Sequence, residues 1–81
     1  MDKIAKTVLE KLLRHGYVGG RHTALENLPK GFPRHDYGEV METAEDLIRQ
    51  GLIILKPTGY GTQVSLDPHR MAEIERIIND P

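Results

Sequence analysis

The stretch that decides the fold is DYGEVMETAEDLIRQ (residues 36–50), followed by Gly51 and then by LIILKPTGYGTQVSL (residues 52–66). Apolar residues in the first part recur at i, i+3, i+4, i+7, i+10 and i+11 from Tyr37, which predicts an amphipathic helix. Gly51 follows this helix directly, at the position where a residue in the left-handed conformation commonly ends a helix. In the second part, two apolar runs flank the turn-forming residues PTGYG, which predicts a β-hairpin. The sequence therefore predicts a helix that leads directly into a hairpin.

The helix has two alternative starts. Pro33 is suited to the first helical position, which would give a helix over residues 34–50. Asp36 and Glu39 have the spacing of a capping box, which would start the helix later. The hairpin strands are expected at residues 52–56 and 62–66, with an exposed tip over residues 56–62.

Upstream of this stretch, the spacing of apolar residues predicts a helix over residues 2–14 that ends at Gly16. Tyr17 and Val18 are expected to form a short strand. Thr23-Ala24-Leu25-Glu26 matches a capping box and predicts a short second helix, which Pro29 would end soon after Leu28.

Downstream, Asp67 and Pro68 have the residue types of an N-cap and a first helical residue. They predict a fourth helix with an apolar face. We expect this helix either to pack on the first helix or to pair with a second copy of the chain. The residues of the apolar face, and of the homodimer interface in the second case, are Met71, Ile74, Ile77 and Ile78.

The composition predicts one domain, residues 1–81, in a cytoplasmic protein. The chain has 81 residues, no Cys and a net charge of −1. The lack of Cys excludes disulfides and thiolate nucleophiles. No apolar run approaches the roughly 18 residues of a membrane span. We also find no pattern of paired catalytic groups or of cofactor binding, so we expect neither an enzyme nor a cofactor protein.

The charges separate along the chain. Residues 14–35 have four basic residues and one acidic residue, a net charge of +3, and three of the four histidines. Residues 36–50 have one basic and five acidic residues, a net charge of −4. Such an asymmetry bears on partners rather than on fold.

The predicted order is helix, short extended segment, capped short helix, tight turn, long helix, hairpin and helix. This order resembles a winged helix-turn-helix domain over nearly the whole chain. The string GGRHTALENLPKGFP, followed by LIRQGLIILKPTGYGTQVSL, is also similar to small archaeal winged-helix proteins of poorly defined function. The resemblance implies an α+β fold with a three-helix core, a C-terminal hairpin wing and an extra C-terminal helix. It also implies a regulator of transcription that binds double-stranded DNA through the third helix and the wing.

The outer face of the third helix departs from that family pattern, because recognition helices usually present basic and amide side chains to bases. Here that face presents Glu39, Glu42, Glu45 and Asp46. The predicted contacts therefore move to the basic segment before the helix and to the hairpin tip. Tyr60 is expected either to be exposed and stack on a ligand or to cover its own hairpin. The predicted nucleic-acid-binding residues are Arg21, His22, Lys30, Arg34, His35, Lys56, Thr58 and Tyr60.

The charged residues also allow two other interpretations. The acidic helix face is either plain solvated surface or the docking face of a protein-interaction module. His15, His22, His35 and Asp36 include residue types that bind zinc. However, no two of the histidines have the i, i+4 spacing of ligands on one helix, so no metal site is expected.

Overall fold

Three α-helices and a three-stranded antiparallel sheet form the protein in the computed structural model, which describes residues 3–81. The fold is thus mixed α+β, as expected. The α-helices and strands follow the order α1 (Lys3–Arg14), β1 (Thr23–Ala24), α2 (Tyr37–Arg49), β2 (Ile53–Thr58), β3 (Gly61–Leu66) and α3 (Met71–Ile78). Three short 3₁₀ helices complete the order: η1 (Leu25–Asn27), η2 (Arg34–Asp36) and η3 (Pro68–Arg70).

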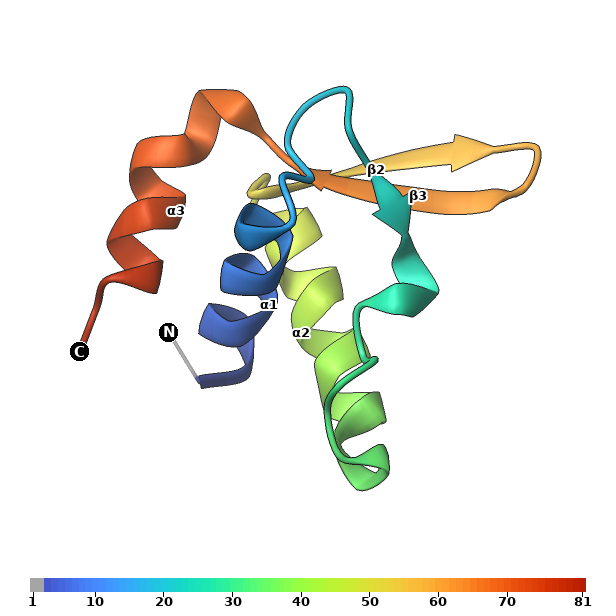
Figure 1. The fold of residues 1–81 in the computed structure, drawn as a ribbon, viewed down its shortest axis with the longest axis horizontal. Helices are drawn as coiled ribbons and strands as arrows, with labels where there is room; N and C mark the ends of the chain where they lie inside the picture. The colour runs from blue at the N-terminus through green and yellow to red at the C-terminus, as the bar shows by residue number, and fades with distance from the viewer. Residues whose placement is uncertain (1–2) are drawn as a thin grey trace.

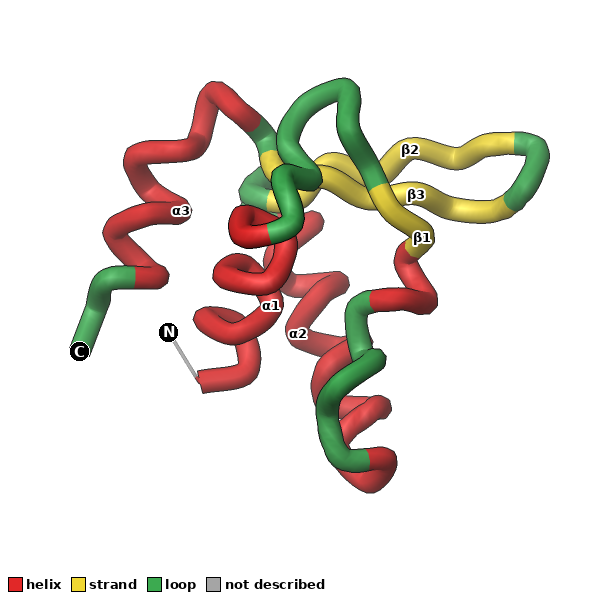
Figure 2. Tube along the Cα trace, in the orientation of Figure 1, coloured by secondary structure: helices red, strands yellow, loops and turns green. Residues whose placement is uncertain are grey.

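The helices form one layer, and the hairpin projects away from it. Figure 1 shows α1 between α2 and α3, and α1 makes contacts with both neighbours. The sheet has the strand order β1-β3-β2, so β3 is central. Figure 2 shows that the hairpin of β2 and β3 extends well beyond the helices. The predicted strand at Tyr17 and Val18 is reduced to a single parallel bridge between Val18 and Leu66.

The first two α-helices end as the glycine positions predict. Gly16 has φ +73° and Gly51 has φ +79°. After α2, the Leu52 amide donates to the Leu47 carbonyl (3.1 Å) and the Gly51 amide donates to the Ile48 carbonyl (3.0 Å). These two bonds form a Schellman motif, which satisfies carbonyls that a helix end leaves free. The equivalent bonds follow α1, so Gly16 and Gly51 are confirmed as helix-ending residues.

The hairpin is confirmed and is longer than predicted. Its strands pair from Ile53 with Leu66 to Thr58 with Gly61, which leaves a two-residue loop. Pro57 lies within β2, although proline cannot donate to a strand ladder. It is tolerated because β2 is an edge strand, where one side of the backbone has no strand partner.

The predicted short second helix is wrong. Thr23 and Ala24 form β1, with Thr23 opposite Val64, and only one 3₁₀ turn follows. The Thr23 hydroxyl accepts a hydrogen bond from the Asn27 side-chain amide (3.0 Å), so the capping box does not form. Pro29 leaves too few residues for an α-helix to close more than one or two of its bonds. Pairing with β3 gives the same backbone groups better partners.

The long helix begins at the later of its two expected starts. A 3₁₀ turn covers residues 34–36, and α2 begins at Tyr37. Asp36 lies at the N-cap position of α2, but its side chain makes no capping bond there. The predicted start at Arg34 therefore describes a tighter turn rather than α-helix.

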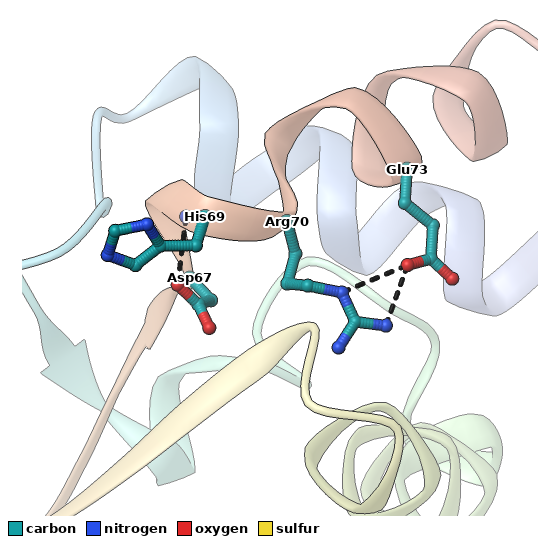
Figure 3. A network of polar contacts seen from close by, with 4 residues as sticks. All are labelled: Asp67, His69, Arg70 and Glu73. Carbon is teal, nitrogen blue, oxygen red and sulfur yellow. Dashed lines mark hydrogen bonds and ion pairs between the residues drawn. The ribbon is translucent and has the colours of Figure 1, made fainter.

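The C-terminal helix has the predicted cap. Asp67 accepts a hydrogen bond from the His69 amide (2.9 Å), and Pro68 is the first residue of η3 (Figure 3). The α-helix itself begins at Met71, three residues later. Arg70 donates from Nε (3.0 Å) and Nη2 (2.7 Å) to Glu73 Oε2, as the dashed lines in Figure 3 show. Residue 2, the predicted start of the first helix, lies outside the described residues.

One apolar core joins all three α-helices to the sheet. Its fully buried residues come from α1, from Leu28 just after η1, from α2, from Leu52 and the hairpin, and from α3. The largest are Leu9, Leu12, Leu28, Leu47, Leu52, Ile53, Leu66 and Ile74. Within residues 3–81, none of the helices is both long enough and apolar enough to cross a membrane.

Candidate nucleic-acid interface

The basic segment of the chain runs from one end of the molecule to the other. Figure 1 shows the loop of residues 19–22 at one end, next to the sheet, and η2 at the opposite end, at the start of α2. Arg21 and His22 are in the first of these, whereas Arg34 and His35 are in the second. The predicted basic contacts therefore form an extended row rather than a single cluster.

A compact group of cations nevertheless lies in the middle of this row. The Lys11 ammonium donates to the Lys30 carbonyl (2.6 Å) and to the Asn27 carbonyl (3.0 Å), and lies 3.5 Å from the Leu28 carbonyl. These bonds attach the segment after η1 to α1. Partial burial lowers the pKa of Lys11, and the nearby charges of Lys30 and Arg14 lower it further. Lys11 thus lies close enough to Lys30 and to Arg14 to be repelled by both.

Within residues 3–81, these cations have no carboxylate partner. The ion pairs of the described chain are His35 with Asp36, Arg49 with Asp46, and Arg70 with Glu73. No carboxylate oxygen of residues 3–81 lies within 4.0 Å of a charged nitrogen of any other basic side chain in that range. The basic residues left without a carboxylate partner include Lys11, Arg14, Arg21, Lys30, Arg34 and Lys56.

Two of the predicted basic contacts have specific surroundings. The Arg21 guanidinium lies over the end of α1, with Nη1 3.6 Å from the position that a Cβ atom would take at Gly16. His35 is exposed, and its Nε2 lies 3.5 Å from Asp36 Oδ1. Arg21 thus lies beside the end of α1, whereas His35 has an acidic neighbour.

The hairpin tip presents one aromatic side chain to solvent. Tyr60 is 100% exposed, so it does not fold back over its own hairpin. The Thr58 hydroxyl donates to the Gly61 carbonyl (2.7 Å) and accepts from the Tyr60 amide (3.2 Å). Thr58 therefore closes the turn that presents Tyr60. Its hydroxyl proton is donated to the Gly61 carbonyl rather than to a ligand. Lys56 is exposed on β2.

The solvent face of α2 is acidic, as the sequence indicates. Glu39, Glu42, Glu45 and Asp46 are all exposed. Among them, only Asp46 has an ion-pair partner among the described residues, Arg49 one turn later. This face would repel phosphates, so it is unsuited to lie against a nucleic-acid backbone.

The apolar face of α3 packs on α1, which is the first of the two arrangements that the sequence predicts. Ile74 is fully buried in the core of its own chain. Met71, Ile77 and Ile78 are partly buried against the same core. A homodimer interface on this helix stays a prediction, and Ile74 is not available to it in this arrangement.

Among the described residues no metal-binding cluster indicates a function for this site, and no related protein does so either. In the described part of the chain, no three His, Cys, Asp or Glu side chains gather in a group that could hold a metal ion. In comparisons with known proteins, no family model, curated protein or solved structure gives a significant match.

The part that Lys11 plays could not be predicted from the sequence. Its position beside the apolar face of α1 is typical of a solvated lysine, and nothing nearby in the sequence indicates otherwise. Its partners are 16 and 19 residues away, so only the tertiary structure brings them together. Arg14 was recognised as part of the basic segment but not as a neighbour of Lys30.

Proposed function

We propose that this protein is a small winged-helix regulator that binds double-stranded DNA in the cytoplasm. The basic contacts are Arg21, His22, Lys30, Arg34, His35 and Lys56, with Tyr60 at the hairpin tip. The observation that carries the proposal is the row of basic side chains from the loop before β1 to the start of α2, most of which have no carboxylate partner within residues 3–81. Unpaired cations spaced along a protein suit a polyanion with regularly spaced phosphates.

The dimensions of the molecule support the same proposal. The protein measures 39 × 32 × 22 Å along its principal axes. The second of these is close to one turn of B-DNA, about 34 Å. Contacts near both ends of the row can therefore reach phosphates about one turn apart. In this mode the acidic face of α2 stays outside the groove, which distinguishes the mode from insertion of the long helix.

The proposal predicts DNA binding that depends strongly on salt and on two exposed cations. Fluorescence anisotropy would follow the titration of a labelled duplex at about 50 and 200 mM salt. The double variant Lys30→Ala/Arg34→Ala should weaken binding about tenfold and reduce the salt slope by about 2, because it removes two phosphate contacts. The control variant Lys3→Ala/Arg76→Ala removes the same charge from α1 and α3. It should leave both quantities close to those of the unmodified protein.

The proposal fails if the duplex gives no anisotropy change at the lower salt concentration. It also fails if the two double variants weaken binding equally, because the net charge alone would then explain the effect. Circular dichroism of both variants would check that the fold is intact.

A second candidate function is a winged-helix module that captures a basic protein partner through α2. The observation that favours it is the exposed face of Glu39, Glu42 and Glu45, which have no ion-pair partner among residues 3–81. Glu42→Lys/Asp46→Lys separates the two functions. If DNA passes close to α2, this charge reversal should strengthen duplex binding severalfold, because it replaces repulsion by attraction. Unchanged DNA binding together with loss of a purified partner would instead favour the interaction module.

A further inference from the structure

Two adjoining hollows lie between α1 and the segment that follows β1. The larger has a volume of about 320 Å³, and the second has about 260 Å³. Lys11 and Lys30 line both, so the two hollows share a cationic wall. Volumes of this order are at the lower end of the range for small-molecule sites.

The cation at the centre of this wall is held in place. Lys11 Nζ donates to the Lys30 carbonyl (2.6 Å) and to the Asn27 carbonyl (3.0 Å), with the Leu28 carbonyl at 3.5 Å, and these contacts restrict the long side chain. An ammonium group has three donors and three carbonyls are within reach of Lys11, so Lys11 contributes mainly its positive charge to the hollow. The exposed Lys30 is the group that can donate hydrogen bonds to a ligand. A cation that is already ordered loses less conformational entropy when an anion binds.

The charge around the hollows lacks a counterion within the described chain. Lys30 and Arg14 are near enough to Lys11 to lower its pKa, after the larger effect of burial. No carboxylate of residues 3–81 pairs with any of the three. A bound anion would offset this repulsion, because it would place a negative charge beside Lys11 and Lys30.

The rest of the larger hollow is suited to a ring rather than to a second charge. Its walls include Leu12, Leu28 and the side chains of His15 and Tyr17. The rings of His15 and Tyr17 lie 6.1 Å apart between centroids and are tilted by 33°. Aromatic side chains in this arrangement can contact the face or the edge of a flat ligand.

One polar group completes the site. Thr23 lines the larger hollow, and its hydroxyl accepts a hydrogen bond from the Asn27 side chain. The hydroxyl can still donate its own proton, since Ser and Thr hydroxyls are both donors and acceptors. Such a donor would help to orient an anionic group.

We propose that the larger hollow binds a small aromatic anion, with the carboxylate or phosphate group at Lys11 and Lys30 and the ring against Tyr17, Leu12 and Leu28. The site is separate from the hairpin tip and from η2. The proposal does not rest on DNA binding, and its test uses no DNA.

Phenyl phosphate and phenylacetate are the probes, and two-dimensional ¹H–¹⁵N NMR is the readout. Amides of residues 11–17 and 23–30 should shift in a saturable way, with a dissociation constant of about 1 mM or below for one probe or both. Inorganic phosphate lacks the ring and 2-phenylethanol lacks the charge, so each should bind at least about tenfold more weakly. Either head group satisfies the proposal, because both offer a compact anion to the lysines.

Lys30→Gln is the decisive variant, because Lys30 is exposed whereas Lys11 also holds backbone carbonyls. It should weaken binding of the tighter probe about tenfold, as expected for loss of a charge-assisted hydrogen bond. Lys56→Gln, on the hairpin, removes the same charge elsewhere and should change nothing. The proposal is overturned if neither probe saturates, if inorganic phosphate binds as tightly as phenyl phosphate, or if both variants bind alike.

Discussion

Replacement of Ile74 by alanine should lower the free energy of unfolding by about 3 kcal/mol, because buried Ile-to-Ala changes cost about 2–5 kcal/mol. Ile74 is the one fully buried residue of α3, and α3 packs on α1. A domain of this length has a total stability of about 4–12 kcal/mol, so the loss would be a large share of it. Denaturant unfolding followed by circular dichroism would measure the change.

Leu55→Ala is the matched control for this prediction. It removes the same number of carbons from a side chain that is 44% exposed on β2, so its cost should stay at about 1 kcal/mol or less. Equal losses for the two variants would contradict the placement of α3 in the core. The unfolding midpoint of the unmodified protein should also be the same at about 5 and 100 μM, whereas a dimer through α3 would raise it with concentration.

The elements that sequence reasoning predicted well are those with local causes. The long helix has a regular apolar stripe, and Gly51 supplies the left-handed residue that ends it. Asp67 and Pro68 start the last turn-and-helix segment by bonds within a few residues. The hairpin follows from apolar runs on either side of a glycine-rich turn. In each case the determining interactions lie within one element or one turn.

The features that were missed depend on contacts between distant parts of the chain. Thr23 has the residue pattern of a helix cap, but it pairs with Val64 on β3, 41 positions away. A local capping preference of about 1 kcal/mol is small compared with completion of a sheet edge. Lys11 likewise has the pattern of a surface lysine until Asn27 and Lys30 are brought to it. The cationic hollow, which is built from both segments, could not be predicted from either one.

Gly51→Ala should lower the free energy of unfolding by about 2 kcal/mol, and two causes combine. Alanine at φ +79° costs about 1 kcal/mol, because its Cβ crowds the backbone in the left-handed region. In addition, that Cβ would lie 3.1 Å from Arg70 Nη1, closer than ordinary van der Waals contact. Figure 3 shows what a shift of Arg70 would disturb: its guanidinium donates to Glu73 through Nε and Nη2, so moving it aside costs part of that ion pair.

Two other glycines separate these causes. Gly16 has a similar φ of +73°, but its Cβ would meet Arg21 at 3.6 Å, an ordinary contact. Gly16→Ala should therefore cost only the backbone part, about 1 kcal/mol. Gly38 lies in α2 with nothing within 4 Å, so Gly38→Ala should raise stability by about 0.5 kcal/mol through helix propensity and unfolded-state entropy.

Arg70→Met tests the second cause directly. In that background, the cost of Gly51→Ala should fall to that of Gly16→Ala, because the Met side chain has no guanidinium and no bond to Glu73. Thermal or denaturant unfolding of the four combinations at positions 51 and 70 gives the coupling between them, and a value near 1 kcal/mol is expected for groups in contact. Additive effects would mean that the left-handed backbone alone excludes a side chain at position 51. A clear coupling would instead show that Arg70 packs against the end of α2 and ties α3 to the helix that leads into the hairpin.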